Sequence, residues 1–154
     1  MNTIGNRADI FAILEEQDRM IIANLKSFAE NYLSFSNDSA LKKIKEIFDM
    51  ISAHFKQLDQ LIACVEKDSE LEAAVEEYKR EKRLINDQIL HLTQLHVDET
   101  GFRRYIKELA DYIRELALLE STSLHEKLED RLTTSQLEMI NRKISQETTF
   151  GRRF

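Results

Sequence analysis

Apolar residues recur every three or four positions along most of this chain, which is the pattern of amphipathic helices. Polar stretches at 34–39 and 98–101 interrupt the pattern. It predicts four long helices and a short fifth one, at residues 7–33, 39–67, 69–97, 102–130 and 135–146. Residues 148–154 show no helical period, and we expect them to form a C-terminal tail.

Two short motifs predict where helices begin. A Ser or Thr followed three residues later by Glu or Gln can form a capping box, in which each side chain bonds the other residue's backbone N–H. Ser69 and Glu72 have this spacing, and so do Thr133 and Gln136. They predict helix starts close to Ser69 and Thr133.

The predicted helices are long and their connections are short. The chain has no proline and three glycines, so few residues disfavour helix interiors. Helices of about 27 residues would each be about 40 Å long. Short connections make sequential helices antiparallel. The sequence thus predicts an all-α fold: an up-down-up-down four-helix bundle with a short C-terminal fifth helix, in a single domain over residues 1–147.

Composition narrows the class of protein. The formal net charge of −6 argues against nucleic-acid binding, which needs clustered Lys and Arg. No apolar run approaches the roughly 18–20 residues of a membrane span. Residues 1–12 lack the order of a secretory signal, and Cys64 is the single cysteine. We therefore expect a cytoplasmic protein without nucleic-acid or membrane partners.

Four polar residues interrupt the apolar stripes near the middle of the predicted helices. Gln17, His54 and Glu120 have apolar residues three and four positions away, whereas Lys82 has fewer such neighbours. Counted from the ends of antiparallel helices, all four fall at one level, within about one 5.4 Å turn. We expect a buried polar layer, in which charges must find partners. Lys82 either pairs with Glu120 inside it or extends its long side chain outward.

The segments around these positions resemble motifs of the hemerythrin-like (HHE cation-binding) family of four-helix bundles. The resemblance spans residues 9–145 and rests on Leu14–Met20, His54–Leu58, Lys82, Leu116–Glu120 and Leu124–Thr133. In that family, a histidine in helices one and three and a His-x-x-x-Glu motif in helices two and four hold two irons. The resemblance implies the bundle fold and, where the ligands are kept, a di-iron centre.

The resemblance also implies that this chain has lost most of those ligands. Four of the family's ligand positions hold other residues: Gln17, Leu58, Lys82 and Leu116. The remaining two, His54 and Glu120, do not suffice for a dinuclear iron site, and the Lys82 cation would repel a metal. We therefore expect no metal and no other cofactor. If a metal does bind, with iron as the alternative, His54 and Glu120 are its expected ligands.

The other candidate residues have ordinary surroundings. His91 and His125 have mostly polar helical neighbours, so we expect both on the surface. Cys64 lies beside Leu61, and we expect it to fill space in the core. Residues 150–154 mix aromatic and basic side chains, which predicts disorder or packing against the helices, with a docking peptide as the alternative.

Three functions fit these expectations. The first is a non-enzymatic, metal-free protein-interaction or signalling module that works through a protein partner or through self-association. The second is a metal protein that senses oxygen or redox state, with iron or zinc in an unusual site built from His54, Glu120, Gln17 and a carboxylate such as Glu16 or Glu81. The third is a helical secretion-type chaperone, since such proteins share the acidic, proline-free composition.

Overall fold

The computed structural model describes the backbone of residues 2–65, 68–96 and 100–151, and the side chains of residues 10–65, 68–96 and 100–143. Within these residues all regular structure is helical. The elements are α1 (Asn2–Asn31), η1 (Tyr32–Ser34), α2 (Asn37–Ala63), α3 (Glu72–Thr93), α4 (Phe102–Leu119), η2 (Glu120–Leu124), α5 (His125–Arg131) and α6 (Thr134–Gly151). The all-α class predicted from the sequence is confirmed.

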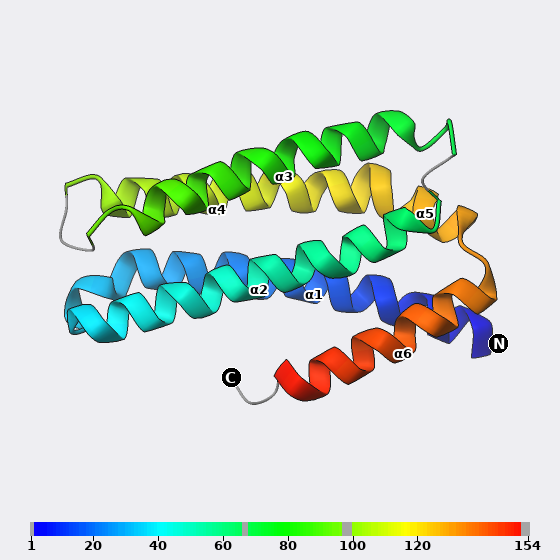
Figure 1. The fold of residues 1–154 in the computed structure, drawn as a ribbon, viewed down its shortest axis with the longest axis horizontal. Helices are drawn as coiled ribbons and strands as arrows, with labels where there is room; N and C mark the ends of the chain where they lie inside the picture. The colour runs from blue at the N-terminus through cyan, green and yellow to red at the C-terminus, as the bar shows by residue number, and fades with distance from the viewer. Residues whose placement is uncertain (1, 66–67, 97–99, 152–154) are drawn as a thin grey trace.

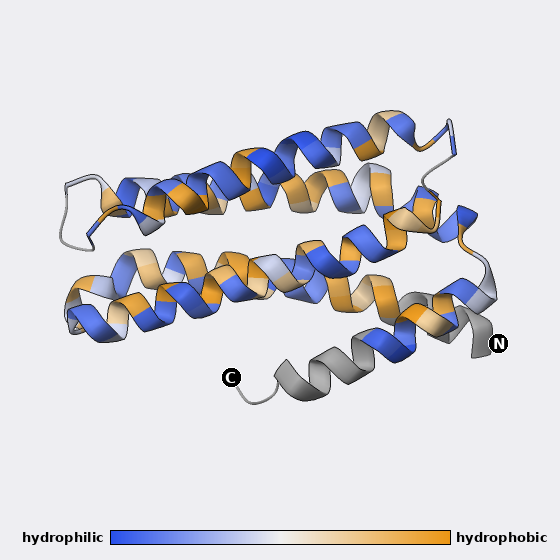
Figure 2. Ribbon diagram, viewed as in Figure 1, coloured by the Kyte–Doolittle hydropathy of each residue, from blue (hydrophilic) through white to orange (hydrophobic). Residues whose placement is uncertain are grey.

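The long helices lie alongside one another (Figure 1). α1 packs against both α2 and α4, α3 packs against α4, and α6 lies against α1. Hydrophobic and hydrophilic residues alternate along the coloured parts of the long helices in Figure 2. The buried residues form one continuous core that extends from Ile10 of α1 to Ile140 of α6. Hydrophobic burial along this core therefore joins α6 to the long helices.

The two predicted capping boxes have different outcomes. Thr133 and Gln136 form the complete motif: the Thr133 N–H donates to Gln136 Oε1 at 2.9 Å, and the Gln136 N–H donates to Thr133 Oγ1 at 3.1 Å. Ser69 does not cap α3, which begins at Glu72 without a side-chain cap. The Asp68 carboxylate instead accepts the Glu70 N–H at 2.9 Å. A charged carboxylate is a stronger acceptor than a hydroxyl, so the turn forms around Asp68.

The C-terminal part of the chain is more helical than expected. α6 continues to Gly151, so residues 148–151 belong to a helix and the predicted tail begins later than residue 148. Its last part, residues 152–154, lies outside the described residues, and so do the side chains of 150 and 151. The prediction about residues 150–154 as a docking peptide therefore stays a prediction.

The fourth predicted helix, 102–130, corresponds to three consecutive elements: α4, η2 and α5. They run without a break, but the middle one, η2, is a π-helical turn. Gly101 caps the start of α4 with φ +97°, a left-handed conformation that strains any residue with a Cβ. Among the described helices, none combines the length and apolar character needed to cross a membrane.

Candidate functional site

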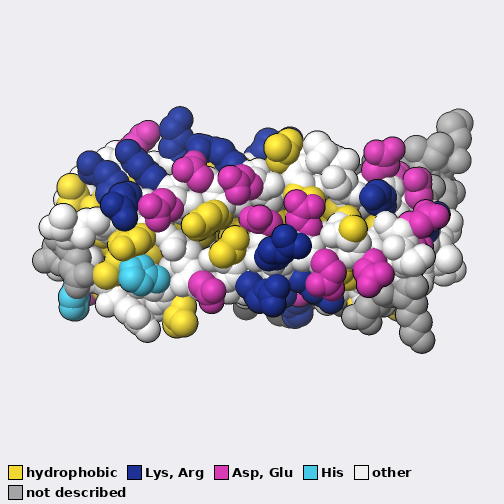
Figure 3. All heavy atoms as spheres, turned by 90° about the horizontal axis from the view of Figure 1, so that it is seen from above, with side chains coloured by type: hydrophobic (Ala, Val, Ile, Leu, Met, Phe, Trp, Pro, Cys, Tyr) yellow, Lys and Arg dark blue, Asp and Glu magenta, His cyan; other side chains and the backbone are white. Residues whose placement is uncertain are grey.

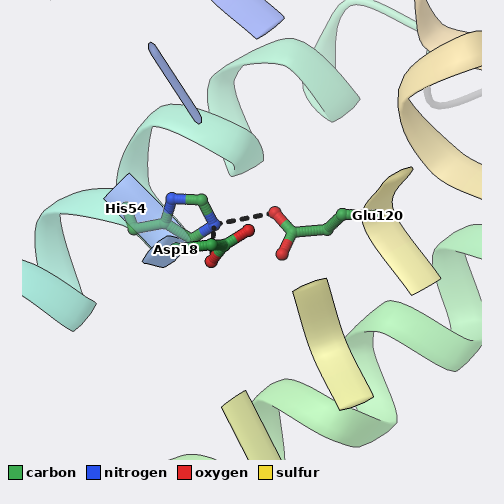
Figure 4. Close-up of side chains that lie close together, drawn as sticks. All are labelled: Asp18, His54 and Glu120. Carbon is green, nitrogen blue, oxygen red and sulfur yellow. Dashed lines mark hydrogen bonds and ion pairs between the residues drawn. The ribbon is translucent and has the colours of Figure 1, made fainter. Parts of the chain in front are cut away.

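Three buried side chains from three helices converge between the long helices. Asp18 comes from α1, His54 from α2 and Glu120 from the junction of α4 with η2 (Figure 4). His54 Nε2 lies 2.7 Å from Glu120 Oε1 and 3.1 Å from Asp18 Oδ1. Asp18 is 4% exposed and Glu120 is fully buried. We call these three residues the inner cluster.

Two glutamines hold the His54 ring in place. Gln17 Oε1 lies 2.8 Å from His54 Nδ1, and Gln17 Nε2 donates to Gln57 Oε1 at 2.7 Å. Because a carbonyl oxygen can only accept, His54 must donate from Nδ1 to Gln17. In a neutral imidazole this leaves the Nε2 lone pair available to an ion, whereas the hydrogen bond from Nε2 to Glu120 Oε1 requires a proton on Nε2. Gln17 thus acts through His54 by fixing its tautomer, as an outer partner does at a metal-binding histidine.

Several polar atoms of this region have no hydrogen-bond partner. They are Asp18 Oδ1, Glu120 Oε2, and both ring nitrogens of His125. Asp18 Oδ1 is close to His54 Nε2 without the alignment of a hydrogen bond. Buried unpaired polar atoms are uncommon in proteins and costly, so a proton or a bound ion is needed to complete the set.

Burial and neighbouring side chains shift the pKa values of the two carboxylates in opposite directions. Burial, followed by the Glu120 charge, raises the pKa of Asp18 from 3.8 to about 10. Burial acts to raise the pKa of Glu120 as well, but the imidazoles of His125 and His54 outweigh it and hold that pKa below its ordinary value. These opposite pKa shifts favour a proton on Asp18 over one on Glu120.

Lys82 does not pair with Glu120, which corrects one of the two arrangements considered from the sequence. Its Nζ lies 2.6 Å from Asp59 Oδ2, and the Tyr78 hydroxyl donates to Asp59 Oδ1 at 2.8 Å. The side chains of Lys82 and Asp59 are 28% and 44% exposed. The long lysine side chain reaches outward, as the alternative arrangement predicted. We call Tyr78, Asp59 and Lys82 the outer network.

The expectation that His125 lies on the surface is wrong. The residue is buried at 5% exposure, its ring packs against the Phe11 ring, and Nε2 lies 3.6 Å from Glu120 Oε1. The sequence argument assumed a regular α-helix, in which residues five apart point in directions roughly 140° apart. The π-turn at η2 brings Glu120 and His125 to the same side instead.

Two signals in the sequence could have located the missed residues. On α1, the buried stripe passes through Leu14, Asp18 and Ile21, whereas Gln17 is only half-buried. From α4 through η2 to the end of α5, buried positions recur every four residues, at Leu116, Glu120, Leu124, Leu128 and Leu132. A four-residue spacing drifts by roughly 40° per repeat in an α-helix, and a π-turn absorbs that drift.

The remaining candidates lie elsewhere. Glu16 is exposed and accepts a hydrogen bond from Arg19 Nε at 3.0 Å. Glu81 is half-buried, and its pKa is raised by burial and then by Glu115. His91 is exposed and its ring contacts Tyr105, as expected for a surface histidine. None of these belongs to the inner cluster.

No protein-family model matches the chain, and no curated protein or solved structure is significantly similar to it. A function must therefore be inferred from the geometry and chemistry of these side chains. The hemerythrin-like resemblance stays a hypothesis that rests on the sequence motifs.

Proposed function

We propose that the chain forms an up-down-up-down four-helix bundle of the hemerythrin-like kind and binds a divalent transition-metal ion in its centre. The inner cluster supplies the ligands: an imidazole nitrogen from His54 and carboxylate oxygens from Asp18 and Glu120. The observation that carries the proposal is their convergence, with one ligand atom from each within 4.8 Å of the others. Imidazole and carboxylate together are the ligands used by zinc and non-haem iron.

Charge and hydrogen bonding support this proposal. Asp18 and Glu120 are two buried carboxylates. Lys82, which stands at one of the family's ligand positions, forms an ion pair with Asp59 and does not neutralise them. A divalent ion would neutralise both carboxylates and would use the free oxygens of each. Gln17 would orient the metal-binding nitrogen of His54 through the other ring nitrogen.

A di-iron centre does not fit the same residues. Di-iron bundle proteins use about six inward-pointing carboxylate and histidine ligands from four helices. Here Leu58 and Leu116 are fully buried apolar residues, and Lys82 brings a positive charge. This proposal requires only one ion, so it agrees with the expectation from the sequence that the di-iron centre has been lost.

The proposal is tested by metal binding to chelator-treated protein. Titration with Zn²⁺ or Fe²⁺, followed by calorimetry and elemental analysis, should give about one ion per chain. The isosteric changes Asp18→Asn and Glu120→Gln should each weaken binding strongly, because each removes one negative ligand. Asp59→Asn is the matched control, since it changes a carboxylate of the outer network. Binding that is absent, or that Asp59→Asn weakens as much as Asp18→Asn does, would reject the proposal.

A metal-free interaction module is the second candidate. The raised pKa of Asp18 favours it, because one proton shared with Glu120 also relieves the repulsion within the pair. The protein would then act in the cytoplasm as a non-enzymatic signalling or protein-binding module. Figure 3 shows one face of the molecule, on which charged side chains of both signs have hydrophobic ones between them. Exposed apolar residues such as Leu90 and Leu118 would contact a partner or a second copy.

Sedimentation of metal-free protein tests the self-association form of this candidate. Association that strengthens with concentration and is weakened by Leu118→Glu would support it. A monomer at every concentration would leave only a separate protein partner as the binding target.

A further inference from the structure

The π-turn at η2 fixes the relation between Glu120 and His125. The His125 N–H donates to the Glu120 carbonyl, which is the five-residue bond that defines a π-turn. Residues joined by such a bond lie one turn apart on the same side of the helix. Isolated π-turns inside α-helices often occur at functional sites, where they direct a side chain that an α-helix would turn away.

His125 has surroundings that suit a metal ligand. Its side chain is 6% exposed, and neither ring nitrogen has a hydrogen-bond partner. Nε2 lies 3.6 Å from Glu120 Oε1, and Nδ1 lies 3.8 Å from Glu15 Oε1. An imidazole always has at least one N–H to donate, and ion-pair contacts of 3.6 and 3.8 Å are too long to be hydrogen bonds, so leaving both nitrogens without one in the interior is costly. The ring therefore needs a partner beside Glu120.

We propose that His125 is the fourth ligand of a single tetrahedral ion of the zinc class, together with Asp18, His54 and Glu120. This inference rests on the metal site proposed above and names the kind of ion that it holds. Two atoms bound to one tetrahedral ion at about 2.0–2.2 Å lie roughly 3.3–3.6 Å apart. The 3.6 Å separation of His125 Nε2 and Glu120 Oε1 is at the upper end of that range. His54 Nε2 lies closer, 2.7 Å from the same oxygen and 3.1 Å from Asp18 Oδ1, so these ligands would move apart when the ion binds. The ligand atoms within 4.8 Å of one another belong to Asp18, His54 and Glu120, so the His125 ring would also move toward the ion.

The ligand chemistry selects among ions. Two imidazole nitrogens and two carboxylate oxygens are a borderline set, which suits Zn²⁺, Co²⁺ or Fe²⁺. Ca²⁺ and Mg²⁺ prefer all-oxygen sites with six or more ligands, so they should bind poorly here. Two of the four ligands, Asp18 and His125, do not stand at the ligand positions of the hemerythrin-like motifs. The site is therefore distinct from a di-iron centre with missing ligands.

Cobalt spectroscopy tests the coordination directly, because tetrahedral Co²⁺ absorbs visible light far more strongly than six-coordinate Co²⁺. Wild-type protein should bind one Co²⁺ with the intense tetrahedral bands. His125→Ala should weaken the bands and lower the affinity by more than the roughly 10–100-fold typical of an outer-shell partner. His91→Ala, at an exposed histidine, is the matched control and should change neither.

The outcomes separate this inference from the metal site itself. No Co²⁺ binding by wild-type protein would overturn both. One Co²⁺ with the same spectrum and affinity in His125→Ala would overturn the role of His125 and leave the three-ligand site standing. Two ions per chain would overturn the single-ion site.

A measurement on the unaltered chain covers the case in which His125→Ala fails to fold. The chain has four histidines, and Zn²⁺ titration followed by ¹⁵N NMR of the imidazoles reports on each. Signals of His54 and His125 should move together at one equivalent, while those of His91 and His96 stay fixed. Movement of His54 alone would overturn the inference.

Discussion

The inner cluster and the outer network show two ways of placing carboxylates between helices. Both contain ionisable side chains, and Phe55 contacts members of each, with its ring 6.3 Å from that of His54 and 6.2 Å from that of Tyr78. In the outer network both oxygens of Asp59 have partners, one from Tyr78 and one from Lys82. In the inner cluster one oxygen of Asp18 and one of Glu120 have none.

The difference lies in where the positive charge comes from. The chain itself supplies the outer network with Lys82, and partial exposure keeps the cost of the charges low. The inner cluster is buried and has two carboxylates around one imidazole, so a proton or an ion must complete it. The outer network can therefore be purely structural, while the inner cluster has the chemistry to bind something.

The largest expected effect is the loss of a buried partner. Glu120→Ala should lower the free energy of unfolding of metal-free protein by roughly 3–5 kcal/mol, because it leaves His54 without its closest partner. Lys82→Met should cost less than about 1 kcal/mol, as is typical of exposed ion pairs. Urea denaturation of both variants measures the difference. Similar losses would show that burial does not distinguish the two regions.

Metal addition should stabilise the folded protein through the inner cluster and not through the outer network. Zn²⁺ at a hundred times its dissociation constant should raise the free energy of unfolding by about 2.7 kcal/mol, provided that the unfolded chain does not bind it. Thermal denaturation with and without Zn²⁺ measures this. The gain should disappear in Asp18→Asn and persist in Lys82→Met. A gain that survives Asp18→Asn would place the ion elsewhere.

The pH dependence of metal-free protein should reveal the extra proton. The folded state raises the pKa of Asp18 from 3.8 to about 10, so between these values the native state binds more protons than the unfolded state. Stability should therefore fall as pH rises from 6 to 9, with a slope of at most about 1.4 kcal/mol per pH unit. The lowered pKa of Glu120 acts only in acid, below its ordinary value of 4.5.

Asp18→Asn supplies the control for that slope, because an amide has no proton to lose in this range. Equilibrium denaturation at each pH should show a flatter profile for the variant than for wild-type protein. An unchanged slope would assign the dependence to another group.

The smallest expected effects concern the pairing of Lys82. A double-mutant cycle with Lys82→Met and Asp59→Asn should give a coupling energy of about 0.2–1 kcal/mol. The corresponding cycle with Lys82→Met and Glu120→Gln should be additive to within about 0.3–0.5 kcal/mol. A larger coupling energy in the second cycle would show that Lys82 interacts with Glu120, in contrast to its ion pair with Asp59 in the structure.

Local sequence patterns predicted the helices because the formation of a helix depends mainly on residues that are close together in the sequence. The three- to four-residue period located the long helices to within a few residues, and the Thr133 box is formed as its spacing requires. The Ser69 box failed where a neighbouring carboxylate, Asp68, competed for the backbone. Propensity and period are properties of one segment, so one sequence is enough to read them.

The centre of the molecule was only partly predictable. The structure brings Gln17, His54 and Glu120 together through hydrogen bonds, as the helical positions suggested. Asp18 was overlooked although the apolar stripe of α1 passes through it. A more careful count of that stripe would have identified it, since the required information is local.

The position of His125 and the partner of Lys82 were decided by the tertiary structure alone. A π-turn changes the direction of every later side chain, and its cost is recovered only when the redirected residues pack against other helices. The sequence offered Glu120 as a partner for Lys82, but the packing of α2 against α3 brought Asp59 to it instead. The sequence by itself determined which segments are helices and, where the helix is regular, the main apolar stripe that each one buries. The choice of contacts between helices depends on their relative rotation, which no single segment encodes.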